Sequence, residues 1–172
     1  MEIQPIKTEV EYDAASAPET AGRQLAPVIA SLQHHLGANL IAVVLFGSRA
    51  RGDHHRDSDW DLLVIAERLS KKTFQRHLHL KQILPPLWRG RVAILAKTPA
   101  EFETGIPSLF LDVALDGIIL YDTDDYVSGR LTQLRRLIST AGLYREQRGR
   151  DLVWQWQVFP GIGHQLTWEG VI

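Results

Sequence analysis

Two apolar runs that lie close together constrain the fold more than any other feature of this 172-residue sequence. Residues 40–46 and 60–66 are short, rich in Val, Leu and Ile, and bounded by polar residues or glycine. Runs of this length and composition predict strands that are buried on both faces of a sheet. The connection between them is short, so we expect the two strands to be neighbours.

Two carboxylates stand one residue apart at the start of the second run. In an extended chain residues i and i+2 point to the same face, so Asp59 and Asp61 should lie side by side. Paired carboxylates repel at neutral pH unless a proton or a cation lies between them. A hard divalent ion prefers such oxygen ligands and keeps waters and phosphates in its other positions. The pair therefore predicts a site for Mg²⁺ (or Mn²⁺). The alternative is a pair of exposed acids that closes a turn.

The segment between the strands has the composition of an anion site. Gly47 lets the chain approach a ligand closely, and Ser48 adds a hydroxyl to the backbone N–H groups of the turn. Arg49, Arg51 and Arg56 follow and add local positive charge. An anion site beside a dication site indicates a nucleoside triphosphate as the ligand. No P-loop, dinucleotide-binding glycine motif or nucleophile elbow is present in the sequence.

The rest of the chain predicts alternating helices and strands. Apolar spacing and end signals predict the following helices and strands: a helix over 18–36, a helix over 70–84, a strand over 90–97, a capped turn at 98–101, a helix over 108–116, a strand over 118–121 and a helix from 124. In the helix over 70–84 we expect Phe74 and Leu78 to face the core. Trp154 and Trp156 share one face of an extended tail, which favours packing on an apolar surface over a ligand platform.

Composition limits the classes of protein to consider. The net charge is −1, so no global basic field predicts DNA as a partner. There is no cysteine, which excludes disulfides and thiolate metal sites. No apolar run is long enough to cross a membrane, and the N-terminus lacks a signal-peptide pattern. We expect a cytoplasmic protein with an N-terminal arm at 1–17, one main domain at 18–145 and a Trp-rich extension at 146–172 packed on it. The oligomeric state is not encoded in any visible pattern.

The central motif resembles a known family. Phe46-Gly47-Ser48, ten intervening residues and Asp59-Trp60-Asp61-Leu62 are similar to the signature of the nucleotidyltransferases related to DNA polymerase β. The run Gly-Ser-Arg-Ala-Arg-Gly before Ser-Asp-x-Asp-Leu is similar to the minimal, antitoxin-type branch of that superfamily. The tight match covers about 20 residues, and a looser similarity in element order extends to Tyr121.

The resemblance implies a mixed α/β (α+β) fold in which a central sheet is flanked by helices. It implies that Asp59 and Asp61 are catalytic and bind the metal, and that a nucleoside monophosphate is transferred with release of pyrophosphate. AMP from ATP is the expected donor group. The residues expected to bind the nucleotide are Gly47, Ser48, Arg49, Arg51 and Ser58.

One departure from the family pattern concerns a third carboxylate, which normally comes from a neighbouring strand. The corresponding run, residues 91–97, contains no acid. Glu101 and Glu103 follow it and are weak candidates, although Glu101 fits a capping box with Thr98. Loss of this carboxylate would weaken transfer and spare nucleotide binding.

Three functions remain open at this point. The first is transfer to a protein or RNA end. The resemblance to the minimal branch implies an antitoxin that acts on a separate helical ribonuclease toxin as one form of this function. The second is transfer to a small hydroxylated compound, as in aminoglycoside-modifying relatives, although these usually carry an added helical domain. The third is a degenerate module that binds a nucleotide or a partner and has lost its chemistry.

Overall fold

A computed structural model of the chain describes residues 17–149 and 151–172. The predicted arm at 1–17 lies outside these residues except for Ala17, where the first helix begins. The elements in chain order are α1 (Ala17–Leu36), η1 (Gly37–Asn39), β1 (Leu40–Phe46), α2 (Gly47–Arg51), β2 (Trp60–Ala66), α3 (Thr73–Ile83), η2 (Pro86–Trp88), β3 (Val92–Lys97), α4 (Pro99–Glu103), α5 (Ser108–Asp116), β4 (Ile118–Asp122), α6 (Tyr126–Thr140), β5 (Leu143–Arg148), β6 (Asp151–Trp156), β7 (Leu166–Thr167) and β8 (Gly170–Val171).

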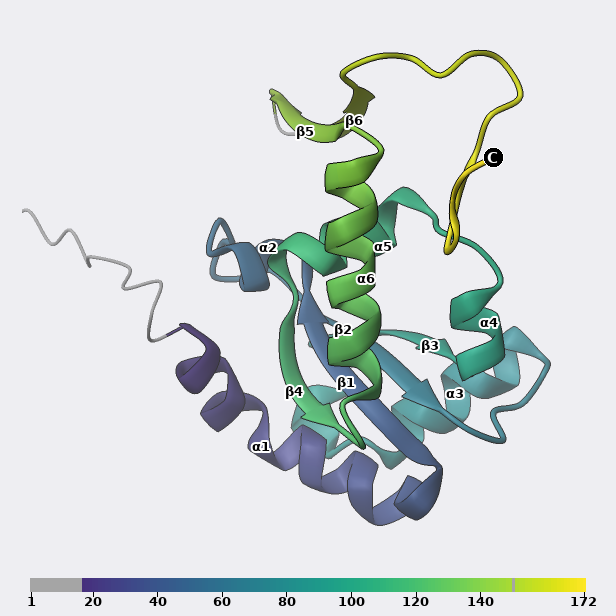
Figure 1. The fold of residues 1–172 in the computed structure, drawn as a ribbon. Coiled ribbons are helices and arrows are strands. Elements are labelled where there is room, and N and C mark those ends of the chain that lie inside the picture. The colour runs from purple at the N-terminus through teal and green to yellow at the C-terminus, as the bar shows by residue number, and fades with distance from the viewer. Residues whose placement is uncertain (1–16, 150) are drawn as a thin grey trace, which may run out of the picture.

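The two apolar runs form the centre of a four-stranded mixed sheet with the order β3-β2-β1-β4. Strand β1 runs antiparallel to both β2 and β4, while β2 and β3 are parallel. The predicted pairing of the two runs is confirmed, and it sets Phe46 at the end of β1 opposite Asp61 near the start of β2. The polar segment 47–59 therefore lies at one end of the sheet (Figure 1).

Helices cover both faces of this sheet, as alternation along the central strands requires. On one face Val43 and Leu45 of β1 join Leu62 and Val64 of β2 in a core with α1 and α3. On the other face the core contains the alternate residues of β1 and β2 together with α4, α5 and α6. The predicted mixed α/β fold with flanking helices is confirmed.

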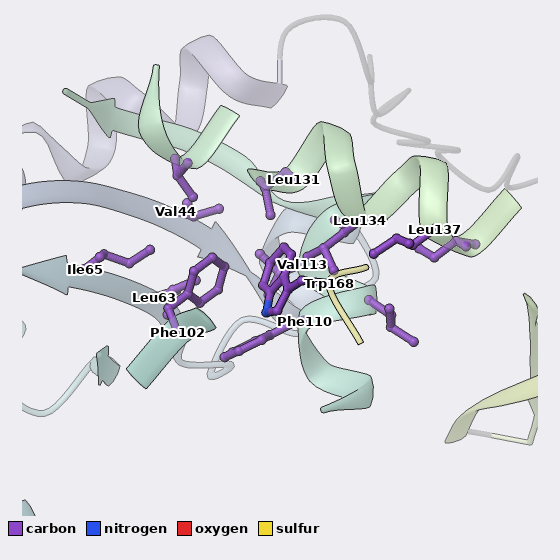
Figure 2. Packing of buried hydrophobic residues seen from close by; sticks show 14 of the residues in the cluster. Val44, Leu63, Ile65, Phe102, Phe110, Val113, Leu131, Leu134, Leu137 and Trp168 are labelled. Carbon is purple, nitrogen blue, oxygen red and sulfur yellow. The ribbon is translucent and has the colours of Figure 1, made fainter. Parts of the chain in front are cut away.

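The second core also takes in the C-terminal segment (Figure 2). Trp168 is only 9% exposed, and its ring lies 5.7 Å from that of Phe102. Its backbone oxygen accepts a hydrogen bond of 2.8 Å from the side-chain amide of Gln133 on α6. Trp154 and Trp156 of β6 pack against the same core, as their shared face predicted. The hairpin of β5 and β6 and the hairpin of β7 and β8 are separate from the main sheet.

Helix α3 differs from the prediction in the side it buries. Phe74 is 75% exposed and Leu78 is 45% exposed, whereas Leu80 and the following Leu84 are each 1% exposed. Phe74 and Leu78 form an i, i+4 pair within the helix, so apolar spacing favours their face. Leu80 and Leu84 form a second apolar pair, of which Leu84 lies just beyond the end of the helix at Ile83. The sheet is covered by the second pair. Ser70 does not cap this helix, whose N-cap residue is Lys72.

Other local predictions agree with the structure. Thr98 and Glu101 form the expected capping box at the start of α4, with Pro99 in the first turn. Helix α6 begins at Tyr126, where both oxygens of Asp122 accept hydrogen bonds of 2.9 Å from the backbone of Val127 and Ser128. No helix within residues 17–149 and 151–172 is long and apolar enough to cross a membrane.

Candidate active site

The centre of the site is the close approach of Gly47 to Asp61. Gly47 has a φ of +73°, a region that favours glycine. A Cβ built on Gly47 would collide with the Asp61 carboxylate and would lie 3.2 Å from its carboxyl carbon. The register of β1 and β2, which sets Phe46 opposite Asp61, produces this approach. The sequence motif therefore corresponds to one compact arrangement in which glycine makes room for a carboxylate.

Asp59 and Asp61 differ in their surroundings. Asp59 precedes β2 and is exposed, while Asp61 is partly buried within the strand. Burial raises the pKa of Asp61 above its ordinary value of 3.8, and the charge of Asp59 raises it further, while Arg51 opposes the shift. The influence of Asp59 on the pKa of Asp61 is consistent with two neighbouring carboxylates. The structure brings together two oxygen-bearing acids whose ionised forms favour a bound cation.

Ser48 follows Gly47 in the first turn of a short helix, α2, where a turn was expected. Its backbone oxygen accepts hydrogen bonds of 2.9 Å and 3.1 Å from the N–H groups of Gly52 and Asp53. The Ser48 hydroxyl has no protein partner among the described residues and is partly exposed. It is free to bind a ligand on the Gly47 side of Asp61.

Arg49 is occupied by its own loop. Its guanidinium donates hydrogen bonds to the backbone oxygens of Ser58 at 2.9 Å and Arg56 at 3.3 Å. The same group lies 4.3 Å from the centre of the Trp60 ring. Arg49 was expected to bind the nucleotide. In the structure its contacts also stabilise the loop that leads into Asp59.

Arg51 and Ser58 are also engaged within this loop. Arg51 forms an ion pair of 3.1 Å with Asp53 and is close enough to influence the pKa of Asp61. The hydroxyl of Ser58 accepts a hydrogen bond of 2.9 Å from the N–H of His55. Arg51 therefore pairs with Asp53 and lies near enough to Asp61 to lower its pKa, while the Ser58 hydroxyl binds the loop backbone.

The two weak candidates for a third carboxylate have other partners. Glu101 accepts hydrogen bonds of 2.7 Å and 2.8 Å from the guanidinium of Arg76, which lowers its pKa to about 2. Glu103 accepts a hydrogen bond of 2.7 Å from the Tyr126 hydroxyl and pairs with Arg130 at 2.6 Å. Within the described part of the chain, no group of three His, Cys, Asp or Glu residues is placed to hold a metal ion.

A hollow of about 450 Å³ adjoins Asp59. It is lined by residues of the loop before β2 and of the turn before β3, namely Arg49, Arg56, Asp57, Ser58, Asp59, Trp60, Gly90 and Arg91. Sequence reasoning did not single out Arg91, because no local motif marks it. Its position follows from the parallel pairing of β2 and β3, in which the Trp60 N–H donates a 2.8 Å hydrogen bond to the Arg91 oxygen.

Comparison with known families agrees with this geometry. The model of the family "Polymerase beta, Nucleotidyltransferase" matches residues 28–126, which include both aspartates and the Gly47–Ser48 turn. The chain belongs to this nucleotidyltransferase family. It is accordingly an enzyme of the nucleotidyltransferase class, as the motif predicted.

Three individual proteins are similar to this chain. A protein of Methanocaldococcus jannaschii, provisionally named a protein adenylyltransferase, is 34% identical over 106 residues, which make up 59% of this chain and 72% of that protein. Among solved structures, a toxin-antitoxin crystal structure with AMP-PNP is 21% identical. The match covers 66% of this chain and 86% of the matched chain, with a TM-score of 0.49. A chain in a structure of a tri-AMPylated Shewanella oneidensis HEPN toxin in complex with MNT antitoxin is 16% identical. The match covers 72% of this chain and 87% of the matched chain, with a TM-score of 0.47.

Proposed function

We propose that this nucleotidyltransferase transfers AMP from ATP, with a divalent metal ion, to a hydroxyl group of a protein acceptor. The observation that carries the proposal is the contact between Gly47 and the carboxylate of Asp61, with Asp59 one residue apart. This geometry supports a donor site for a phosphate chain beside two acids that would bind the metal. The adenylyl group is supported by the name of the 34% identical relative.

The residues present fit a divalent metal ion. Asp59 and Asp61 would hold Mg²⁺ or Mn²⁺, since two repelling carboxylates supply the oxygen ligands that such ions prefer. The raised pKa of Asp61, caused partly by the charge of Asp59, is the sign of that repulsion. When bound, such an ion neutralises charge on the phosphate groups and thereby favours displacement at phosphorus.

The protein residues bind and orient the reactants. The Ser48 hydroxyl and the backbone N–H groups of Gly47 and Ser48 contact the triphosphate, and Arg51 adds positive charge beside it. Arg49 and Ser58 keep the preceding loop in place through the contacts described above. In this assignment three of the five predicted nucleotide-binding groups meet the ligand, and Arg49 and Ser58 act as positioning residues.

The reaction is an in-line displacement. The acceptor oxygen forms a bond to the α-phosphorus of ATP, and the bond from that phosphorus to the bridging oxygen of the pyrophosphate breaks. The pyrophosphate leaves with the electron pair, and the hydroxyl proton passes to water. Positioning and charge neutralisation supply most of the acceleration in reactions of this kind.

A protein acceptor is favoured over RNA by charge. The chain has a net charge of −1, so it lacks the overall positive field that drives binding along a polyphosphate backbone. A separate helical toxin is one protein that fits the proposal. If ATP binds and nothing is transferred, the chain is the degenerate module considered from sequence.

The test combines binding and transfer. Calorimetry is expected to show ATP binding that strengthens with Mg²⁺, and Asp59→Asn and Asp61→Asn should each remove the metal-dependent part. Asp124→Asn is a matched control, because Asp124 is exposed, distant from the motif in sequence and has a positive φ that asparagine tolerates. Transfer is measured with α-³²P-ATP and proteins captured from the host. Equal binding with and without Mg²⁺ contradicts the metal assignment.

A further inference from the structure

The order of strands separates the two sides of the active site. The Gly47–Ser48 turn follows β1, the two aspartates stand at the start of β2, and Arg91 precedes β3. Because β1, β2 and β3 are consecutive neighbours in the sheet, the aspartates lie between the turn and Arg91. The site thus has one side toward β1 and an opposite side toward β3.

In an in-line displacement the nucleotide and the acceptor bind on opposite sides of the site. The attacking hydroxyl must approach the α-phosphorus opposite the departing pyrophosphate. With the phosphate chain bound on the β1 side by Ser48, the acceptor enters from the β3 side. The hollow of about 450 Å³ beside Asp59 lies on that side, since Gly90 and Arg91 form part of its lining.

The hollow presents two available guanidinium groups. Arg56 and Arg91 are both exposed, and neither side chain has a hydrogen-bond or ion-pair partner among the residues that the structure describes. Their backbones are nevertheless fixed. The oxygen of Arg56 accepts a bond from Arg49, and the oxygen of Arg91 accepts a bond from the N–H of Trp60. Two anchored residues with free cationic ends are suited to bind a carboxylate, because arginine presents paired donors to such groups.

We propose that Arg56 and Arg91 bind the acceptor and select a protein segment whose hydroxyl residue is flanked by glutamate or aspartate. This inference rests on the proposed function and specifies its acceptor. A peptide is favoured over a nucleic acid end because the chain has a net charge of −1, whereas binding along a phosphate backbone is driven by an extended field of positive charge. Single carboxylates need only the two local guanidinium groups of Arg56 and Arg91.

The experiment uses the full chain, α-³²P-ATP, Mg²⁺ and synthetic peptides of equal length. Each peptide carries one serine, threonine or tyrosine flanked by glutamate, glutamine or lysine, and an RNA oligonucleotide with a terminal phosphate forms a further arm. We expect the glutamate peptides to be labelled about tenfold more efficiently than the glutamine peptides, the effect of one charge-assisted contact. In the double variant Arg56→Glu, Arg91→Glu the lysine peptides should become the better acceptors.

The control variant is Arg68→Glu. Arg68 is exposed and follows the opposite end of β2, so its charge should not affect peptide preference. Affinity for Mg²⁺-ATP, measured by calorimetry, and the melting temperature should stay unchanged in Arg68→Glu. Both are also measured for the double variant, so that its peptide preference is compared at saturating Mg²⁺-ATP and with the fold intact. These readouts separate a fault in acceptor binding from loss of the donor site or of the fold.

Each outcome decides one claim. Reversal of charge preference in the double variant supports the inference. Equal labelling of glutamate and lysine peptides by the unchanged protein overturns it, as does preferential labelling of the RNA. Failure to label any peptide while Mg²⁺-ATP still binds also overturns it. Absence of Mg²⁺-ATP binding by the unchanged protein is a different result, because it rejects the proposed function itself.

Discussion

Gly47 leaves the space that the carboxylate of Asp61 occupies. The glycine has a φ of +73°, and an added Cβ would collide with that carboxylate. This relationship explains why a glycine precedes the serine of the motif, since any side chain here would push the Asp61 carboxylate aside. The backbone conformation alone disfavours other residues by about 1 kcal/mol.

Gly47→Ala is therefore expected to reduce the affinity for Mg²⁺-ATP by about tenfold or more, equivalent to ~1.4 kcal/mol. Calorimetry with and without Mg²⁺ measures the change. Gly129→Ala is the matched control, because nothing lies within 4 Å of its Cβ position and alanine favours the interior of α6. A Gly47→Ala protein that binds Mg²⁺-ATP normally would contradict the proposed site.

Asp61 should destabilise the metal-free protein at neutral pH. Burial and Asp59 raise its pKa above 3.8, so the folded state resists ionisation more than the unfolded state does. Stability is consequently lost as the pH rises from 3.8 through the raised pKa, and it is regained as the pH falls. We expect Asp61→Asn to raise the melting temperature at pH 7 without Mg²⁺ and to remove this part of the pH dependence. An unchanged or lower melting temperature would contradict the repulsion.

The central part of the fold was predictable from sequence because its signals are local. The apolar runs at 40–46 and 60–66, the capping box of Thr98 and Glu101, and the spacing of Asp59 and Asp61 each act over a few residues. Trp168 gave no such signal, since its burial depends on Phe102 and Gln133, which are far away in the sequence. Arg91 was missed for the same reason, because only the parallel pairing of β2 and β3 brings it to the site.

The buried face of α3 shows a further limit of local patterns. Phe74 and Leu78 have helical spacing, but the core beneath the sheet takes in Leu80 and, just beyond the end of the helix, Leu84. We expect Leu80→Ala to lower the free energy of unfolding by about 2–5 kcal/mol, whereas Phe74→Ser should change it by less than about 0.5 kcal/mol. Urea denaturation of the two variants checks this. Comparable losses would mean that Phe74 packs in the folded protein.

Arg49 is expected to act through the loop more than through the nucleotide. Arg49→Lys keeps the charge. A lysine cannot make both hydrogen bonds, to Ser58 and to Arg56, while it also stacks on the Trp60 ring. Hydrogen exchange of residues 52–58 should therefore become faster without bound ligand. If exchange stays unchanged while ATP affinity falls, Arg49 contacts the nucleotide directly.

Glu101 is expected to stabilise the fold and not to serve in transfer. Its carboxylate accepts two hydrogen bonds from Arg76 and one from the N–H of Thr98, and the bonds from Arg76 are the main cause of its pKa of about 2. Because this pKa lies below the ordinary value of 4.5, the stabilisation is present above pH 4.5 and is lost as the pH falls toward 2. The side chain is 40% exposed, so water screens the pair.

Glu101→Gln should accordingly lower the free energy of unfolding by about 1 kcal/mol at pH 7, or ~2–4 °C in melting temperature, with a smaller difference at pH 3. The rate of AMP transfer at a temperature where both proteins are folded should not change. Glu103→Gln tests the neighbouring acid in the same assay, because Glu103 is engaged by Tyr126 and Arg130. Loss of transfer by either variant with its fold intact would identify that glutamate as the third carboxylate, because no structural role of the glutamate would affect the reaction alone.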